Sequence, residues 1–425
     1  MSYPVSFRYD SEDQLYCENL PLKSLAEKCG TPLYVYSKSR LIEKYQALVD
    51  HLKAREISRF SISFAVKSCS NIHILRVFGS LGCGADVVSI GEIQRCLKAG
   101  INPRSIVFSG VGKTIDEIDN ALALGVRSLH VESLSELRQI YDLCRSTQGR
   151  SADICLRVNP EIESPTHKKI ATGSSENKFG IHQNDLKSCL DLIRASGNQL
   201  RLCGIACHIG SQIRDLWPFE SAVEKMQSMA KRLISDGFSL KYIDFGGGFG
   251  IDYHGDGKEF DLDGYAEILK KASDQMPEME FMLEPGRWLV ADCGGLLTKV
   301  LRQKKQGSKH FVIVDAAMTE LLRPTLYEAH HRVLPVNNHE QNPAKLPVDI
   351  VGPVCESGDF LAKDANMPAL KDQELILILD TGAYGASMAS QYNSRPLCPE
   401  ILVHKNSYAI VRRRQTVEDL MQWEL

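Results

Sequence analysis

Lys67 ends an apolar, otherwise uncharged run of residues, Ser61–Val66, and a lysine in that setting is rarely structural. Short runs of apolar and β-branched residues bounded by turn signals are typical of strands buried on both faces. An amine at the end of such a strand can bond covalently to a carbonyl compound as a Schiff base. Lys67 is therefore a candidate catalytic residue.

A glycine-rich stretch, Gly246–Gly250, follows another apolar run and could hold an anion. Tandem glycines such as Gly247 and Gly248 let successive backbone N–H groups approach a phosphate closely. A tight turn with positive φ is the alternative, and alone the stretch is a weak signal. A dinucleotide-binding fingerprint would need glycine or alanine at Ile251, and a P-loop would need glycine at Val107, so neither motif is present.

Glu284, the first residue of Glu284–Arg287, ends a third apolar run. A carboxylate at a buried strand end needs a cation or a hydrogen-bonded proton to offset its desolvation. An ion pair with an arginine such as Arg157 is one interpretation. The other is a protonated ring nitrogen, because this pairing lets an enzyme use pyridoxal 5'-phosphate as an electron sink. Lys67, the glycines and Glu284 together favour that cofactor.

These residues must be positioned by an α/β fold in which strands alternate with helix-like segments. Eight such strands over about 220 residues predict a (β/α)₈ TIM barrel, whose active site lies at the C-terminal strand ends and whose phosphate site often follows strands seven and eight. The eight apolar runs are Ser61–Val66, Ala85–Ser89, Ser105–Ser109, Leu129–Glu132, Ile154–Asn159, Gly204–His208, Tyr242–Phe245 and Phe281–Glu284.

Beyond about residue 286, strand-like runs follow one another without regular helices, which predicts a mostly antiparallel β domain. The short strand Thr31–Tyr36 could join its sheet, so the expected domains are a cofactor-binding barrel at 37–285 and a β domain built from 1–36 and 286–425. The polar segment Asn337–Pro343 is expected to be a surface loop. The later runs are Phe311–Asp315, Asp349–Gly352, Leu375–Leu379 and Ile401–His404.

Three further polar residues are candidates. His208 ends the sixth strand and could stack on a cofactor ring while Ser211 reaches its phosphate, although a core histidine is the alternative. A metal at Cys203, Cys207 and His208 is rejected, because Cys207 and His208 fall on opposite strand faces. No metal site is expected. Cys355 stands in a polar, glycine-flanked loop and is the best candidate for a reactive thiol.

Bulk properties narrow the class of protein. The formal net charge is −3 over 425 residues, so no basic field favours nucleic acid or a membrane surface. The first residues lack the pattern of a signal peptide, and no run reaches the roughly 18 apolar residues of a membrane helix. The 13 cysteines are scattered without framework spacing and are expected to be reduced, which favours a cytoplasmic protein.

From about Thr31 to Val403, the chain resembles the diaminopimelate decarboxylases of the fold-type-III, alanine-racemase-like group of pyridoxal-phosphate enzymes. Several motifs in sequence order are far more specific than any one of them. They are Phe64–Lys67, Asn177–Gly180, His208–Gln212, the glycine-rich stretch, Glu284–Arg287, Leu322–Tyr327, Cys355–Asp359 and Gly382–Gly385.

The resemblance implies a role for each matching residue. Lys67 carries the cofactor covalently, Gly248 with Gly286 and Arg287 binds its phosphate, and Tyr384 contacts both cofactor and substrate. A head-to-tail homodimer is implied as well, with Cys355 reaching the partner's active site to return a proton. The residues expected to hold the amino acid are Arg287, Arg323, Tyr327, Glu356 and Tyr384, with Glu356 supplied across the same interface.

The implied reaction is decarboxylation of meso-2,6-diaminopimelate to L-lysine and CO₂, the last step of lysine biosynthesis. The far end of that substrate carries a carboxylate and an amine, which Arg323 and Glu356 can bind. The alternatives are a related decarboxylase acting on ornithine, lysine or a carrier-bound amino acid, and a non-catalytic cofactor-binding barrel. Departures from the family pattern at Phe64, Ser68 and Thr319 leave room for another substrate.

Overall fold

The computed structural model describes residues 6–162, 178–337 and 346–424, so Asn177 and most of the expected loop at 337–343 lie outside the described residues. The chain forms two compact units. The barrel unit comprises Tyr45–Gly250 and Glu259–Trp288, and the sheet unit comprises Met1–Lys44, Ile251–Lys258 and Leu289–Leu425.

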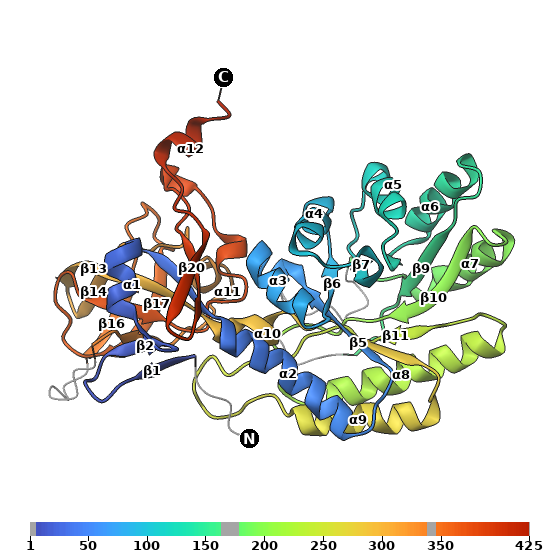
Figure 1. The fold of residues 1–425 in the computed structure, drawn as a ribbon, viewed down its shortest axis with the longest axis horizontal. Helices are drawn as coiled ribbons and strands as arrows, with labels where there is room; N and C mark the ends of the chain where they lie inside the picture. The colour runs from blue at the N-terminus through green and yellow to red at the C-terminus, as the bar shows by residue number, and fades with distance from the viewer. Residues whose placement is uncertain (1–5, 163–177, 338–345, 425) are drawn as a thin grey trace. The chain divides into compact units, whose positions relative to one another are not determined.

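Eight parallel strands form a closed barrel in the barrel unit, which confirms the predicted fold (Figure 1). Strand β12 pairs with β5 in parallel, so the last barrel strand closes against the first. Each strand overlaps one of the eight predicted apolar runs, with the largest shift at β10, which begins four residues before the predicted Gly204–His208. The strands are β5 (Phe60–Ala65), β6 (Gly84–Val87), β7 (Ile106–Phe108), β8 (Ser128–Val131), β9 (Ala152–Arg157), β10 (Leu200–Ala206), β11 (Tyr242–Asp244) and β12 (Glu280–Leu283).

Helices alternate with these strands, and their ends follow from local sequence. Ser89 caps α4 by accepting a hydrogen bond from the backbone N–H of Glu92, and Thr114 forms a capping box with Glu117 at α5. The helices are α2 (Lys38–Ala54), α3 (Ile72–Ser80), α4 (Ile90–Ala99), α5 (Ile115–Leu124), α6 (Leu134–Ser146), α7 (Gln183–Ala195), α8 (Trp217–Ser235) and α9 (Leu262–Gln275), with 3₁₀ turns η1 (Val66–Ser68) and η2 (Pro103–Ser105).

The sheet unit contains a nine-stranded sheet and a separate three-stranded one. Strand β4 lies between β13 and β19, so the N-terminal strand joins the sheet as expected. Most pairs are antiparallel, but β4 pairs with β19, and β14 with β16, in parallel. The strands are β1 (Phe7–Tyr9), β2 (Leu15–Cys17), β3 (Leu20–Pro21), β4 (Leu33–Ser37), β13 (Gly294–Gln306), β14 (Lys309–Val314), β15 (Val333–Pro335), β16 (Leu346–Val351), β17 (Phe360–Met367), β18 (Leu375–Ile378), β19 (Glu400–His404) and β20 (Ser407–Arg412).

The remaining short elements lie between these strands, at the passage from β12 to β13, or after β20. They are α1 (Leu22–Cys29), α10 (Arg287–Val290), η3 (Ala291–Cys293), α11 (Arg323–Tyr327), η4 (Ala386–Met388), η5 (Tyr392–Ser394) and α12 (Val417–Met421).

The barrel interior is packed around the ring of Tyr242 on β11. Tyr242 is fully buried among small and apolar side chains that include Cys155 and Cys203. Gly204 on β10 makes room for the ring, since a Cβ atom there would lie 2.7 Å from two ring carbons of Tyr242. The interior is therefore a close-packed core below the strand ends.

We predict that Gly204→Ala destabilises the protein by about 1–3 kcal/mol, because the added methyl group overpacks this core. Gly112→Ala is the matched control, since a Cβ atom at Gly112 meets nothing within 4 Å. Urea unfolding followed by circular dichroism measures both changes. Equal stability of the two variants would contradict the proposed packing constraint.

Candidate active site

Lys67 lies in η1, directly after β5, and its ammonium group forms an ion pair with Asp86 on the neighbouring strand β6. The distance from Lys67 Nζ to Asp86 Oδ2 is 3.0 Å. The Lys67 side chain is 40% exposed whereas the carboxylate of Asp86 is fully buried. Burial raises the pKa of Asp86, but the positive charge of Lys67 and the hydroxyl of Ser109 outweigh it and lower that pKa below its ordinary value.

Glu284 follows β12 and shares one cavity with Lys67 and His208, so three of the predicted residues lie together. Its Oε1 atom is buried and has no hydrogen-bond partner among the described residues. Burial, then the negative charges of Asp244 and Asp86, raises the pKa of Glu284 well above its ordinary value.

The alternative role for Glu284, an ion pair with Arg157, is wrong. Arg157 Nη1 lies 2.7 Å from Glu132 Oε1, and its guanidinium stacks on the ring of Phe179 at 4.9 Å. Glu132 also accepts hydrogen bonds from the backbone N–H groups of Gly110 and Gly180. Arg157 is therefore already neutralised by another carboxylate.

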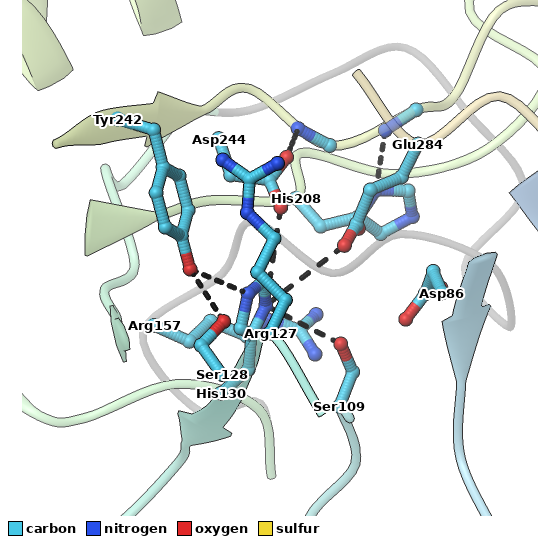
Figure 2. Close-up of polar contacts among 12 residues, drawn as sticks. Asp86, Ser109, Arg127, Ser128, His130, Arg157, His208, Tyr242, Asp244 and Glu284 are labelled. Carbon is cyan, nitrogen blue, oxygen red and sulfur yellow. Dashed lines mark hydrogen bonds and ion pairs between the residues drawn. The ribbon is translucent and has the colours of Figure 1, made fainter. Parts of the chain in front are cut away.

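A second buried carboxylate, Asp244, and a buried imidazole, His130, lie beside Glu284 (Figure 2). His130 Nδ1 is 3.8 Å from Glu284 Oε1 and 3.9 Å from Asp244 Oδ2. The other ring nitrogen lies 3.3 Å from the hydroxyl of Tyr242. Burial lowers the pKa of His130 to about 3, so the imidazole is neutral at physiological pH.

The glycine-rich stretch follows β11 and turns tightly against neighbouring backbone. Gly248 has φ +104°, and a Cβ atom there would lie 2.5 Å from the carbonyl oxygen of Gly210. At Gly247 a Cβ atom would lie 2.2 Å from the carbonyl oxygen of Glu284. Both positions therefore require glycine, and the turn lies directly beside the end of β12.

His208 and Ser211 lie in the segment after β10, beside this glycine turn. His208 is half-buried, and its Nδ1 accepts a hydrogen bond from the backbone N–H of Gly247 at 3.4 Å. Ser211 Oγ accepts a hydrogen bond from Arg287 Nη2 at 2.9 Å. Gly286 lies between Pro285 and Arg287, after β12. The carbonyl oxygen of Pro285 accepts a hydrogen bond from the backbone N–H of Ala65, at the end of β5. The predicted phosphate-binding residues therefore come from adjacent strand ends.

The other predicted site residues belong to the sheet unit. Arg323 is buried at the start of α11, with Nη1 2.8 Å from His331 Nε2 and its guanidinium 4.5 Å from the centre of the Tyr253 ring. Tyr327, the last residue of α11, is half-buried. These contacts fix the orientation of the guanidinium plane of Arg323.

Cys355 and Glu356 are exposed in the turn between β16 and β17. The backbone N–H of Cys355 donates to Asn393 Oδ1 at 3.1 Å. Tyr384 is half-buried and has φ +56°, in the left-handed region that tyrosine rarely adopts. These residues and Lys67 belong to different units, and their predicted convergence in one site stays a prediction.

Sequence reasoning missed Asp86, His130 and Asp244 as members of the site. Each is a polar residue inside an otherwise apolar run, on β6, β8 or β11. That interruption is a usable signal, because a buried ionisable side chain needs a partner. Only the barrel geometry shows that Asp244 and His130 lie beside Glu284.

A family model described as "Pyridoxal-dependent decarboxylase, pyridoxal binding domain" matches residues 38–291. The chain is 44% identical over 411 residues to the diaminopimelate decarboxylase of Zymomonas mobilis, covering 96% of each protein.

Two solved structures resemble the chain along nearly its whole length. A Helicobacter pylori diaminopimelate decarboxylase complexed with L-lysine is 41% identical, with a TM-score of 0.89 over 95% of this chain and 99% of that one. An M. jannaschii diaminopimelate decarboxylase, also in complex with L-lysine, is 32% identical, with a TM-score of 0.92 over 99% of this chain and 98% of that one.

The chain therefore belongs to the pyridoxal-dependent decarboxylases, in the family of diaminopimelate decarboxylases. It is a pyridoxal-phosphate-dependent carboxy-lyase, and the residues present fit that cofactor. Lys67 supplies an amine, the turn at Gly247 and Gly248 admits no side chain, and Glu284 Oε1 is a buried acceptor without a partner in the described chain. Among the described residues, no helix is both long and apolar enough to span a membrane.

We predict that His130 makes the protein less stable in mild acid. The folded pKa of about 3 lies below the ordinary value of 6.5, so between these values the unfolded chain binds a proton that the folded chain does not. The free energy of unfolding should therefore fall as the pH drops below 6.5, by about 2 kcal/mol between pH 7 and pH 5.

Replacing the imidazole removes this contribution. Urea titrations should show that His130→Asn has a difference in stability between pH 7 and pH 5 that is about 2 kcal/mol smaller than that of the wild type. His182→Asn is the control, because His182 is an exposed residue that caps α7 and asparagine is also a good N-cap. An unchanged pH dependence in His130→Asn would show that the imidazole is not held neutral.

Proposed function

We propose that this protein decarboxylates meso-2,6-diaminopimelate to L-lysine and CO₂, the last step of lysine biosynthesis. The observation that carries the proposal is its similarity to diaminopimelate decarboxylases along both units of the chain, not only across the cofactor-binding barrel. A non-catalytic cofactor-binding barrel does not fit a chain that resembles these enzymes from end to end.

Lys67 is proposed to hold the cofactor covalently at the mouth of the barrel. When bound, pyridoxal phosphate supplies an electron sink for the charge left on the α-carbon as CO₂ departs. The carboxylate of Asp86 lies 3.0 Å from Lys67 Nζ, so it can orient the amine and offset the positive charge of its ammonium form. Because Asp86 is fully buried and Lys67 is partly exposed, the ion pair holds the amine in place while the cofactor can still reach it from the barrel mouth.

Two further groups of the barrel unit are proposed to hold the two ends of the cofactor. The backbone of Gly247 and Gly248 and the side chain of Arg287 lie at the ends of strands seven and eight, where such barrels bind phosphate. Ser211, after strand six, is hydrogen-bonded to Arg287. The carboxylate of Glu284 would accept a hydrogen bond from the protonated ring nitrogen. This contact would offset the desolvation of a carboxylate that has a buried oxygen without a hydrogen-bond partner in the described chain. His208 would cover one face of the ring.

The substrate's distal carboxylate is proposed to bind Arg323, assisted by Tyr327, Tyr384 and Arg287. His331 accepts at Nε2 from Arg323, because its Nδ1 lies 2.9 Å from the carbonyl oxygen of Leu379 and must donate there. A guanidinium held in this way presents its fork in a fixed plane, which suits bidentate binding of a carboxylate.

The active site is proposed to be completed across a homodimer. Cys355 and Glu356 are exposed in their own subunit, and we propose that the partner subunit's Cys355 returns a proton to the α-carbon while the partner's Glu356 binds the distal ammonium. We place the enzyme in the cytoplasm, since all 13 cysteines are free thiols and twelve of them are buried or partly buried.

We predict that Arg323→Gln lowers kcat/KM for meso-diaminopimelate by roughly 30-fold or more, because a buried charged partner of the distal carboxylate is lost. Steady-state CO₂ release from meso-diaminopimelate, lysine and ornithine, assayed in parallel, measures both activity and specificity. Wild-type enzyme should prefer meso-diaminopimelate strongly.

L-lysine is a second probe of this contact, since decarboxylation removes the carboxylate on the reacting carbon and the product keeps the distal one. Its inhibition constant should therefore rise in Arg323→Gln by a factor similar to the loss in kcat/KM, and Arg323→Lys should retain part of the activity because it keeps the charge without the fork. A wild-type preference for lysine or ornithine would contradict the proposed substrate. An unchanged inhibition constant for L-lysine in Arg323→Gln would show that Arg323 does not bind the distal carboxylate.

We predict that two inactive variants complement each other if the active site is shared. Lys67→Ala lacks the covalent anchor, and Cys355→Ala lacks the proposed proton donor while still binding the cofactor. In randomly mixed dimers, half of the molecules would contain both variants and each of these would have one intact site, which restores up to about a quarter of wild-type activity.

Co-expression and assay of the mixture give this measurement, and each variant assayed alone is the control. No recovery above the single variants would show that both residues act within one subunit. Full activity of Cys355→Ala alone would remove the thiol from the reaction.

A further inference from the structure

Asp244 and Glu284 form a pair of buried carboxylates at the ends of adjacent strands β11 and β12. Asp244 Oδ2 and Glu284 Oε1 are both buried and both lack a hydrogen-bond partner within the part of the chain that the structure describes. Together with His130 they offer donor atoms that all lie within 4.8 Å of one another (Figure 2). Two such carboxylates cannot both be ionised without a large electrostatic cost.

The positive charges around the pair are already matched to other carboxylates. Lys67 pairs with Asp86, Arg157 with Glu132, and Arg127 with Glu280. His130 Nδ1 lies 3.8 Å from Glu284 Oε1 and 3.9 Å from Asp244 Oδ2, but the imidazole is neutral. Among residues 6–162, 178–337 and 346–424, no neighbouring cation therefore offsets two negative charges here.

The other ionisable groups that face the pair do not change this balance. Asp86 adds a negative charge, and burial keeps the phenol groups of Tyr242 and Tyr265 neutral by raising their pKa values. The thiols of Cys155 and Cys207 are neutral for the same reason, since burial raises their pKa values well above the ordinary range. His208 lines the same cavity as Glu284, and burial lowers the pKa of His208 to about 3, so its imidazole is neutral as well.

We propose that Asp244 and Glu284 share one proton, so that the pair presents a single negative charge to the ring nitrogen of the bound cofactor. The proton bridges the facing oxygens, and Glu284 carries the negative charge once a protonated ring nitrogen lies against it. Asp244 is thus a positioning residue that acts through Glu284. This inference rests on the proposed placement of Glu284 at the ring nitrogen.

Asp244 also links this charge to the phosphate end of the site. Its other oxygen, Oδ1, accepts a hydrogen bond of 2.8 Å from the backbone N–H of Gly246, the first residue of the glycine turn. Burial raises the pKa of Asp244 to about 7, consistent with a carboxyl group that keeps a proton near neutral pH. One side chain therefore braces the turn with one oxygen and holds a proton for Glu284 with the other.

Asp244→Asn separates these two roles. The asparagine carbonyl can still accept from Gly246, and its NH₂ group can still donate to Glu284, but the shared proton is gone. The test is infrared difference spectroscopy of holoenzyme minus apoenzyme at neutral pH, in water and in deuterium oxide, with pyridoxal phosphate as the added ligand.

Wild-type enzyme should show the carbonyl stretch of a protonated carboxyl group that shifts when the cofactor binds and when deuterium replaces hydrogen. Asp244→Asn should lose this band and still bind the cofactor with an affinity within about threefold of the wild type, because its neutral hydrogen bonds are kept. Glu92→Gln is the matched control, since burial raises the pKa of Glu92 to about 7 in the same barrel and its loss should leave the cofactor-responsive band in place.

Three results would overturn the proposal. They are a wild-type spectrum without a cofactor-responsive carboxyl band, persistence of that band in Asp244→Asn, or a stoichiometric metal ion in the purified protein bound by His130, Asp244 and Glu284. The wild-type spectrum decides the question even if Asp244→Asn does not fold. Failure of wild-type enzyme to bind pyridoxal phosphate at all would instead contradict the proposed function.

Discussion

The hydrogen-bonded closure of β12 against β5 is the constraint on which the site depends. Phe281, Met282 and Leu283 pair with Phe60, Ser61 and Ile62 in parallel register, so both strands end at the same rim. This register brings Lys67 and Glu284, which are 217 positions apart in sequence, to the walls of one cavity. An open sheet would leave the two residues at opposite edges, and the chemistry of an amine facing a carboxylate would be lost.

The second theme is the pairing of buried charge. The buried side chain of Lys113 lies 2.7 Å from Glu136. Arg157 and Glu132 form a second ion pair of the same length in the barrel unit. Breaking such a pair costs far more than forming it contributes, so these pairs fix geometry more than they add stability. Glu284 and Asp244 are exceptions, because no cation of the described chain pairs with them. The unmatched charge lies where a positively charged ring nitrogen is proposed to bind.

Sequence alone predicted the barrel well, because eight apolar runs with helices between them admit few other architectures. It predicted the β domain in outline, including the N-terminal strand in its sheet, but missed β13, β17 and β20, whose charged residues such as Lys304, Lys363 and Arg412 hide the strand pattern. Lys67, His208 and Glu284 were found because each ends an apolar run. His130 and Asp244 were not, and the alternative of an ion pair between Glu284 and Arg157 was wrong, since these partnerships depend on which strands are neighbours around the barrel.

Covalent attachment of the cofactor to Lys67 is the central claim, and reductive trapping tests it most directly. The purified enzyme, saturated with pyridoxal phosphate, is reduced with borohydride and digested, and the modified lysine is located by mass spectrometry. The cofactor's mass should be found on the peptide that contains Lys67, and on no lysine peptide of the Lys67→Ala variant. A stoichiometric adduct on another lysine, or no adduct in the wild type, would contradict the account.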